Sequence, residues 1–217
     1  MENKYLIAKS CSQAIEFSKI NSDFSYISGG TDVMINKYQK NNTSKTLIDI
    51  SEIKEIKFLK IDDNEVRIGS STILSDLENN KELEGLFPTF IQSVKSVSSP
   101  LIRKSATLGG NLLCDNRCMY YNQSEWWREA AGNCLKCEGD ICIASGGKRS
   151  CYAKMISDTA PVLISLNASV CIVNNEGEER VLLEDIYSGD GINPHNLSAE
   201  TIIKEIIIPK NNLKVFF

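Results

Sequence analysis

The chain has 217 residues, a formal net charge of −4 and eight cysteines, which is enough material for one large domain or two small ones. The negative charge argues against nucleic acid or a membrane surface as a partner, because both attract basic faces. No leader-like segment and no run of about 18 apolar residues occurs, so no membrane anchor is expected and a cytoplasmic location is predicted. Thiols stay reduced there, which favours metal binding over disulfides.

Strands and helices alternate along the chain, a pattern typical of an α/β fold. Apolar periodicity and β-prone runs carry these predictions. The elements expected, in chain order, are a helix at 10–20, strands at 24–27 and 45–50, a strand pair at 55–61 and 65–68, helices at 73–80, 86–97 and 158–167, and strands at 169–173, 179–183 and 202–208. Asp158 is the expected N-cap of the last helix. A boundary near Ile53 would divide an N-terminal unit, 1–53, from a larger unit, 54–217.

Two glycine-rich segments interrupt these elements. Ser28-Gly29-Gly30-Thr31-Asp32 follows a predicted strand, and Thr107-Leu108-Gly109-Gly110-Asn111 follows a predicted helix. Glycine lets a backbone approach a phosphate closely, and successive N–H groups can form an anion-binding nest. Neither segment matches the dinucleotide fingerprint or the P-loop pattern. The two segments can therefore be interpreted either as simple tight turns or as parts of a nucleotide-binding site.

Residues 112–152 hold six of the eight cysteines and both tryptophans. A disulfide knot, a zinc site, an iron–sulfur site and a cysteine-rich core are the alternatives. From spacing alone, Cys134 and Cys137 with Cys142 and Cys151 are the favoured ligand set, because CxxC is a common metal-binding spacing. Tyr120, Tyr121, Trp126 and Trp127 are expected to pack as an apolar lid. Cys11 and Cys171, outside this segment, are expected to be buried as small hydrophobic residues.

Four ordered motifs carry a resemblance to a known family: SGGTDV at 28–33, IGSSTILSDLE at 68–78, RKSATLGGNLL at 103–113 and SDTAPVLISLNASV at 157–170. In order and spacing they resemble the FAD-binding (medium) subunit of the molybdenum hydroxylases, the xanthine dehydrogenase and carbon monoxide dehydrogenase superfamily. The resemblance implies a two-subdomain α/β (α+β) FAD-binding fold of the vanillyl-alcohol-oxidase type, with FAD between the subdomains. The resemblance also implies a further C-terminal domain in relatives, and this sequence is not expected to include it.

The resemblance also implies which residues contact FAD. They are Ile27, Ser28, Gly29, Gly30, Thr31, Asp32, Val33, Val97, Thr107, Leu108, Gly109, Gly110, Asn111, Asp158 and Ile203. Without it, Asp32 and Asp158 would be interpreted as a turn residue and a helix cap. Arg103 and Lys104 could neutralise a pyrophosphate or be solvated. His195 is assigned no catalytic role.

The cysteine-rich segment, at about 114–152, resembles an insertion in the β subunit of 4-hydroxybenzoyl-CoA reductase, which carries an extra [4Fe–4S] cluster. Its ligand spacing falls on Cys118, Cys134, Cys142 and Cys151, four thiolates for one cluster. Cys114 and Cys137 then become surplus thiols. This set differs from the one that CxxC spacing favours.

The function that the resemblance implies is electron relay. The chain would bind FAD and one [4Fe–4S] cluster, exchange electrons with a ferredoxin-like carrier, and connect to a small [2Fe–2S] subunit and a large molybdopterin-binding subunit. Substrate chemistry would occur on the large subunit, so the chain alone would be an oxidoreductase subunit inactive toward substrate. Two alternatives stay open: a stand-alone flavoprotein reductase, and a zinc-binding scaffold module without flavin.

Overall fold

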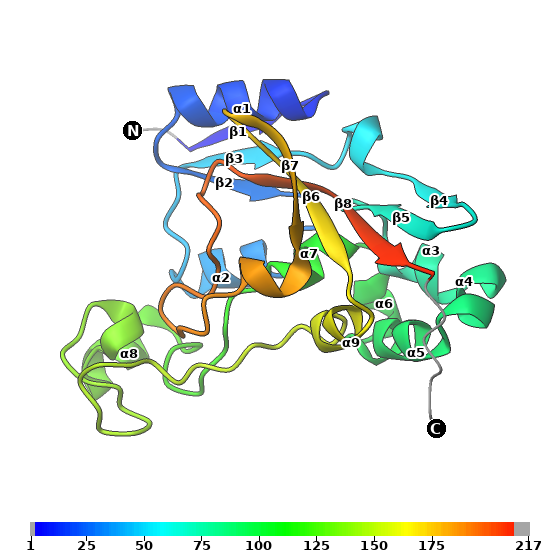
Figure 1. Ribbon diagram of the computed structural model, residues 1–217. Helices are drawn as coiled ribbons and strands as arrows, with labels where there is room; N and C mark the ends of the chain where they lie inside the picture. Colours follow the sequence, from blue (N-terminus) through cyan, green and yellow to red (C-terminus); the bar gives the residue numbers. More distant parts are fainter. Residues whose placement is uncertain (1–2, 211–217) are drawn as a thin grey trace.

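A computed structural model describes residues 3–210, and its N-terminal part is a three-stranded parallel sheet (Figure 1). The strands are β1 (Lys4–Ile7), β2 (Phe24–Ile27) and β3 (Thr46–Asp49), in the order β1-β3-β2. Helix α1 (Cys11–Ile20) begins after the N-cap Ser10, whose side chain accepts a hydrogen bond from the Gln13 N–H. Helix α2 (Val33–Tyr38) follows the first glycine-rich segment.

The second sheet has five antiparallel strands in the order β4-β5-β8-β6-β7. They are β4 (Leu59–Ile61), β5 (Glu65–Gly69), β6 (Ser169–Asn174), β7 (Gly177–Leu182) and β8 (Ile202–Pro209). The last strand lies in the middle, between strands far apart in the sequence. Between β5 and β6 the chain leaves this sheet, and residues 70–168 form one long excursion from it.

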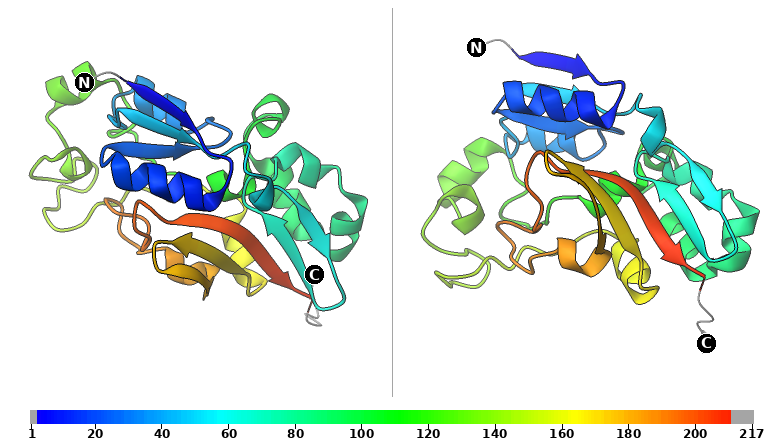
Figure 2. Two further views of the ribbon diagram at one scale, coloured as in Figure 1. Left: turned by 90° about the horizontal axis from the view of Figure 1, so that it is seen from above. Right: turned by 45° about the horizontal axis from the view of Figure 1, so that its top comes forward.

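That excursion carries α3 (Leu74–Glu78), α4 (Lys81–Leu86), α5 (Pro88–Ser96), α6 (Pro100–Arg103), α7 (Leu108–Leu112), α8 (Glu125–Ala131) and α9 (Ala160–Ser165). Figures 1 and 2 show the first sheet and α1 at one end of the molecule and α3 to α6 at the other. The larger core lies between those helices and the second sheet; Phe90 and Val94 of α5 share it with Ile206 of β8. Burial of such side chains is the main stabilising term.

A second, smaller core joins the two sheets. Ala14 of α1 and Ile48 of β3 pack in one cluster with Val173 of β6 and Ile202 of β8. Ile53, where the sequence predicts a boundary, is buried in this same cluster. The two sheets do lie on opposite sides of Ile53 in the sequence, but the division into subdomains stays a prediction.

The cysteine-rich insertion projects to one side of the molecule (Figure 1). Apart from α8 and a short 3₁₀ turn at Leu135–Cys137, it consists of loops. Within residues 3–210, no helix is long and apolar enough to cross a membrane.

Several predicted elements differ from the observed ones. The helix predicted at 86–97 is interrupted at Phe87, because the residue before Pro88 is disfavoured in α conformation and proline begins a new helix. Residues 54–56 form a 3₁₀ turn rather than the start of a strand. Helix α9 begins after Thr159, and Asp158 is not its N-cap. Strand β1 and helices α2, α4, α6, α7 and α8 are short elements that the sequence patterns did not predict.

Candidate cofactor-binding sites

A cavity of about 490 Å³ opens between the first sheet, α7 and the start of β8. Its lining combines small and aliphatic residues, its surface is mostly apolar, and Asp32 and Asp158 are its two charged residues. Thirteen of the fifteen residues implied by the resemblance line it: Ser28, Gly29, Gly30, Thr31, Asp32, Val33, Val97, Thr107, Gly109, Gly110, Asn111, Asp158 and Ile203. The other two, Ile27 and Leu108, are not in the lining and are buried.

Some lining residues were missed by the sequence analysis. Ser70 and Ser71, Ser98, Cys114 and Thr201 all face the same cavity. The signal was present for two of them, because Ser70 and Ser71 lie inside the IGSSTILSDLE motif. The others come from loops whose position only the folded chain decides.

Small residues let three chain segments meet at this cavity. A Cβ on Gly29 would lie 2.0 Å from the Ser105 carbonyl oxygen, and one on Gly109 would lie 2.7 Å from the Ser70 Cβ. The Ser28 and Ser71 hydroxyls lie 3.0 Å apart. Larger side chains at the two glycines would therefore push the segments apart.

The two glycine-rich segments differ in conformation. Gly30 has a φ of +69°, the left-handed region that favours glycine. Within residues 3–210, the N–H groups of Gly29, Gly30 and Thr31 donate to no protein acceptor. This first segment is a turn with several N–H groups available to a ligand.

The second segment is not a turn. Residues 108–112 form the single-turn helix α7, with Thr107 as N-cap accepting from Gly110 N at 3.2 Å. The Gly109 N–H donates to the Ser70 carbonyl at 2.8 Å, and the Leu108 N–H to the Thr72 carbonyl at 3.0 Å. Because these N–H groups already have partners, the prediction of an anion nest is wrong for this segment.

Asn111 holds α7 against the start of α9. Its buried side-chain oxygen accepts from the Ser157 hydroxyl at 2.8 Å and from the Thr159 hydroxyl at 2.6 Å. Asp158 lies between these two donors in the sequence and lines the cavity. Asn111 therefore positions the segment that presents Asp158.

Asp32 is the most constrained charge at the cavity. One carboxylate oxygen accepts from the Arg117 guanidinium, and the other from the Asn36 amide at 2.8 Å. Burial raises the pKa of Asp32, and the positive charge of Arg117 opposes that rise. Its interpretation as a simple turn residue is therefore incomplete, since it joins two elements.

Arg103 is neither solvated nor in the lining of the cavity. It is buried, pairs with Glu78 at 2.6 Å, and donates to the Val97 carbonyl at 2.9 Å. Its role is to hold the loop at Val97 and Ser98, where Ser98 has a φ of +48°. Lys104 is exposed.

His195 packs against Tyr187, with ring centroids 5.7 Å apart. Burial lowers the pKa of the imidazole. The ring is thus part of the packing at residues 187–195, a loop that also contacts the insertion.

Residues 1–211 match the family model of the FAD binding domain in molybdopterin dehydrogenase. The chain belongs to this family. The glycine-lined cavity is accordingly called the flavin cavity below.

Two curated relatives illustrate the match. The FAD subunit of nicotinate dehydrogenase from Eubacterium barkeri is 23% identical over 185 residues, covering 85% of this chain and 50% of the relative. The FAD-binding subunit of an Escherichia coli K12 aldehyde oxidoreductase is 28% identical over 176 residues, covering 78% and 55%. The chain spans about half the length of the curated relatives it matches.

Solved structures share the fold. Quinoline 2-oxidoreductase from Pseudomonas putida 86 superposes with a TM-score of 0.73 at 15% identity, covering 98% of this chain and 60% of the other. Carbon monoxide dehydrogenase from Hydrogenophaga pseudoflava gives 0.71 at 18% identity, covering 96% and 59%. The α/β flavin-domain fold expected from the sequence is confirmed.

The four cysteines implied by the resemblance face one small hollow. Cys118, Cys134, Cys142 and Cys151 line it together with Tyr120, Tyr121 and Lys136. The hollow measures about 10 Å³, roughly the room for one water molecule. Among residues 3–210, no group of three or more Cys, His, Asp or Glu stands close enough to hold a metal ion. The donors fit a cluster in kind, but the loops would have to open to receive one.

The two surplus thiols lie elsewhere. Cys114 lines the flavin cavity, and burial raises the pKa of its thiol to about 12. Cys137 is not in the lining of the hollow. Its backbone N–H donates to the Cys134 carbonyl at 2.7 Å, and burial raises the pKa of its thiol to about 11. A hydrogen bond with Ser145 lowers the pKa of Cys142, whereas burial raises that of Cys151.

Three of the four aromatic residues pack at the hollow or beside it, and one does not. Tyr120 and Tyr121 line the hollow. Trp126 is 75% exposed on α8, and Trp127 packs on Tyr120 with centroids 6.4 Å apart. The prediction is wrong for Trp126, because its position on α8 turns it to solvent. Outside the insertion, Cys11 is buried as predicted, whereas Cys171 is only half-buried.

Lys136 anchors the insertion to the 188–194 loop. Its ammonium group donates to Asp115 at 2.8 Å and to the Gly191 carbonyl at 2.6 Å. The side chain is 4% exposed and lies 5.1 Å from the Tyr121 ring centroid. The cysteine hollow is therefore attached to the body of the protein on this side.

Proposed function

We propose that the chain binds FAD in the flavin cavity and serves as the flavin subunit of a molybdopterin-dependent oxidoreductase. The observation that carries the proposal is the convergence of thirteen motif residues on one cavity in a chain that matches the family over residues 1–211. Bound FAD would supply one- and two-electron transfer. The subdomain boundary near Ile53 and a cytoplasmic location belong to this proposal.

The chain's own residues would bind and orient the flavin. The open N–H groups at Gly29, Gly30 and Thr31 suit the diphosphate, because a turn of successive donors attracts an anion. Asp158 suits a hydroxyl of the ribityl or ribose group, since a carboxylate accepts such hydrogen bonds. The apolar Val97 and Ile203 would exclude water from the ring.

We further propose that Cys118, Cys134, Cys142 and Cys151 hold one [4Fe–4S] cluster. Their convergence on one hollow supports this set over the one that includes Cys137. Two buried and two half-buried cysteines, in a hollow that Lys136 also lines, suit a cluster whose potential depends on burial and nearby charge. The Cys137–Cys134 contact is the observation that favours the CxxC alternative and a zinc site.

The partners follow from the same proposal. A small [2Fe–2S] subunit and a large molybdopterin-binding subunit would complete the enzyme, and a ferredoxin-like carrier would exchange electrons at the insertion. The insertion's resemblance to the 4-hydroxybenzoyl-CoA reductase β subunit supports an acyl-CoA reductase assembly. The proposed subunit is inactive toward organic substrate by itself. Co-purification of the tagged chain should recover the two partner subunits, and recovery of the chain alone with reductase activity would favour the stand-alone flavoprotein.

Cofactor content tests the site assignment. Protein purified without oxygen should release about one FAD on denaturation and contain about four iron atoms per chain, as one cubane requires. Cys142→Ser should lose the iron, whereas Cys137→Ser should keep it. Colourless protein with one zinc would contradict both cofactors. Loss of iron in Cys137→Ser would overturn the ligand set alone.

A further inference from the structure

The insertion leaves and rejoins the body of the protein through a narrow neck at Arg117. The Arg117 N–H donates to the Lys154 carbonyl at 2.8 Å, and the Lys154 N–H donates back at 2.9 Å. This isolated antiparallel bridge joins the outgoing and returning arms. Cys118, a proposed cluster ligand, is the next residue along the outgoing arm. The backbone of Arg117 therefore controls how the two arms of the cysteine loop are spaced.

The side chain of Arg117 reaches the flavin cavity's first glycine-rich segment. Its guanidinium pairs with Asp32 and also donates to the Asn36 side-chain oxygen at 3.2 Å. Asn36 in turn donates to the second carboxylate oxygen of Asp32 at 2.8 Å. Arg117, Asp32 and Asn36 thus form a closed three-residue network, and Arg117 is 25% exposed within it.

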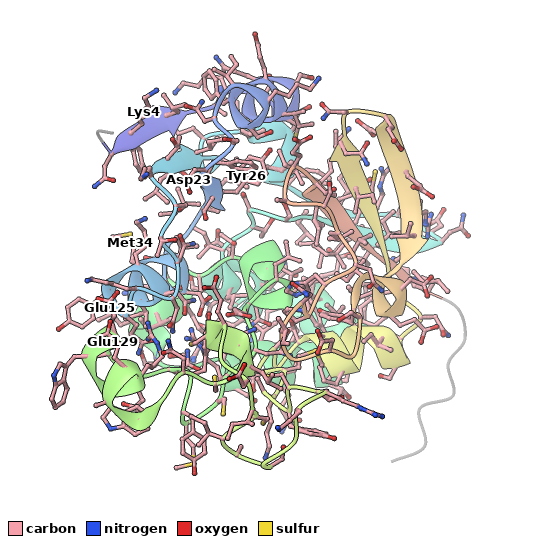
Figure 3. The ribbon with its side chains drawn as sticks, turned by 90° about the vertical axis from the view of Figure 1, so that its left-hand side faces the viewer. Lys4, Asp23, Tyr26, Met34, Glu125 and Glu129 are labelled. Carbon is pink, nitrogen blue, oxygen red and sulfur yellow. The ribbon has the colours of Figure 1, made fainter. Side chains whose placement is uncertain are left out.

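Other contacts attach the insertion to the far end of α2. Arg128 donates to the Gln39 carbonyl at 2.9 Å, and Lys40 pairs with Glu125 of α8. Figure 3 shows α8, with Glu125 and Glu129 labelled, beside α2 and its Met34. These contacts hold α8 in place, but they lie past the C-terminal end of α2. Arg117 contacts Asp32 at the opposite end, where the segment enters the cavity.

We propose that Arg117 is a positioning residue that couples the cysteine hollow to the flavin cavity. This inference rests on the proposed function, which assigns FAD to the flavin cavity and a [4Fe–4S] cluster to the cysteine hollow. A loaded cysteine loop would fix the neck, the neck would fix Arg117, and Arg117 would hold Asp32 and the N–H groups of the preceding turn in place for FAD. Because coupling between two binding sites is reciprocal, FAD would equally stabilise the loaded loop.

Charge gives this contact a second effect. Asp32 lines the cavity that would receive the anionic FAD diphosphate, and like charges repel. Arg117 neutralises the carboxylate from the side facing the insertion. Loss of Arg117 would therefore weaken FAD binding twice, through a mobile turn and through an uncompensated carboxylate.

The test measures the FAD dissociation constant, by flavin fluorescence quenching, for the full chain with iron present and after its removal by a chelator. In the unchanged protein, iron removal should raise the FAD dissociation constant about fivefold or more, which is a typical coupling between two binding sites. In Arg117→Met the constant should start about tenfold higher and change less than about twofold on iron removal. Arg117→Lys should fall between them, because lysine keeps the charge but loses the two-pronged geometry.

Two further variants make the result decisive. Arg149→Met removes the same charge from an exposed position on the same insertion, and it should leave the constant within about twofold of the unchanged protein. Asp32→Asn, alone and combined with Arg117→Met, should give effects that do not add, as expected for residues in contact. Circular dichroism and iron content confirm that each variant is folded and loaded.

The outcomes separate this inference from the proposed function. Equal effects of iron removal in Arg117→Met and in the unchanged protein would overturn the coupling while leaving both cofactors assigned. Protein that binds FAD but never iron would overturn the cluster assignment, and additive effects of Arg117→Met and Asp32→Asn on the FAD constant would then also reject the role of Arg117.

Discussion

The two glycine-rich segments look alike in sequence and behave differently in the fold. SGGTD at 28–32 is a turn with a left-handed glycine, and its N–H groups at 29–31 have no acceptor within residues 3–210. TLGGN at 107–111 begins a helix whose first N–H groups already donate to protein acceptors. The first therefore has N–H groups that suit the proposed FAD diphosphate, whereas the N–H groups of the second are used within the protein. A glycine pair marks a close approach in both places, and both segments line the cavity, but only the first leaves backbone donors open.

The largest effect is expected from Gly29→Ala in the first segment. The new Cβ would meet the Ser105 carbonyl at 2.0 Å, a backbone contact that cannot yield without moving the turn. We expect the FAD dissociation constant to rise about 100-fold, equivalent to about 2.7 kcal/mol, and the free energy of unfolding to fall by about 1–3 kcal/mol. Equilibrium flavin titration and urea unfolding would measure the two effects.

Gly85→Ala is the matched control, because a Cβ there meets nothing within 4 Å in helix α4. It should raise the free energy of unfolding by about 0.5–1 kcal/mol and leave FAD binding unchanged. If Gly29→Ala bound FAD as well as this control does, the first turn would not be the anion contact.

A second prediction concerns the structural role of the other segment. Asn111→Leu would leave the buried Ser157 and Thr159 hydroxyls without their shared acceptor. The free energy of unfolding should fall by about 2–3 kcal/mol, since each unsatisfied buried group costs about 1–3 kcal/mol. Urea unfolding measures it. Ser165→Ala, which removes an exposed hydroxyl bonded within α9, should change stability by less than about 0.5 kcal/mol; an equal loss in both variants would contradict the role given to Asn111.

The smallest effect is expected at the N-cap. Thr107→Val removes the hydroxyl that accepts from Gly110 N, which should cost about 1 kcal/mol of stability. FAD affinity should change less than about threefold, because this helix start offers no open N–H to the ligand. Thermal unfolding and flavin titration would follow both quantities. A large loss of affinity with unchanged stability would show that the second segment does contact the diphosphate.

Much of this fold follows from local sequence patterns. The helix at 11–20, the strand at 24–27 and four of the five strands of the second sheet lie within a residue or two of their predicted bounds, because amphipathic periodicity and β-branched runs are local signals. The exception is β4, which begins four residues later than predicted. The short helices of the excursion were missed, since single-turn helices depend on packing rather than on propensity. The helix predicted at 86–97 begins only at Pro88, because the residue before a proline is disfavoured in α conformation.

The residues of the site, too, are only partly predictable from local sequence patterns. The motifs identify the residues that line the flavin cavity, yet Ser98 and Thr201 reach it from segments without any such signal. Arg103 is a candidate phosphate ligand in sequence and a buried partner of Glu78 in the fold. Burial of a charge depends on neighbours that are distant in the chain, and no local pattern reports them.

Residue types and their spacing predict the class of fold, the ordered motifs of a flavin domain and the set of thiols available to a metal. The folded chain was needed to show that, within residues 3–210, the N–H groups of SGGTD stay open whereas those of TLGGN are bonded, and that Arg117 joins the cysteine loop to Asp32. The physical reason is that residue type and spacing set which groups a chain carries, whereas hydrogen bonds between distant segments decide which of those groups remain free to bind.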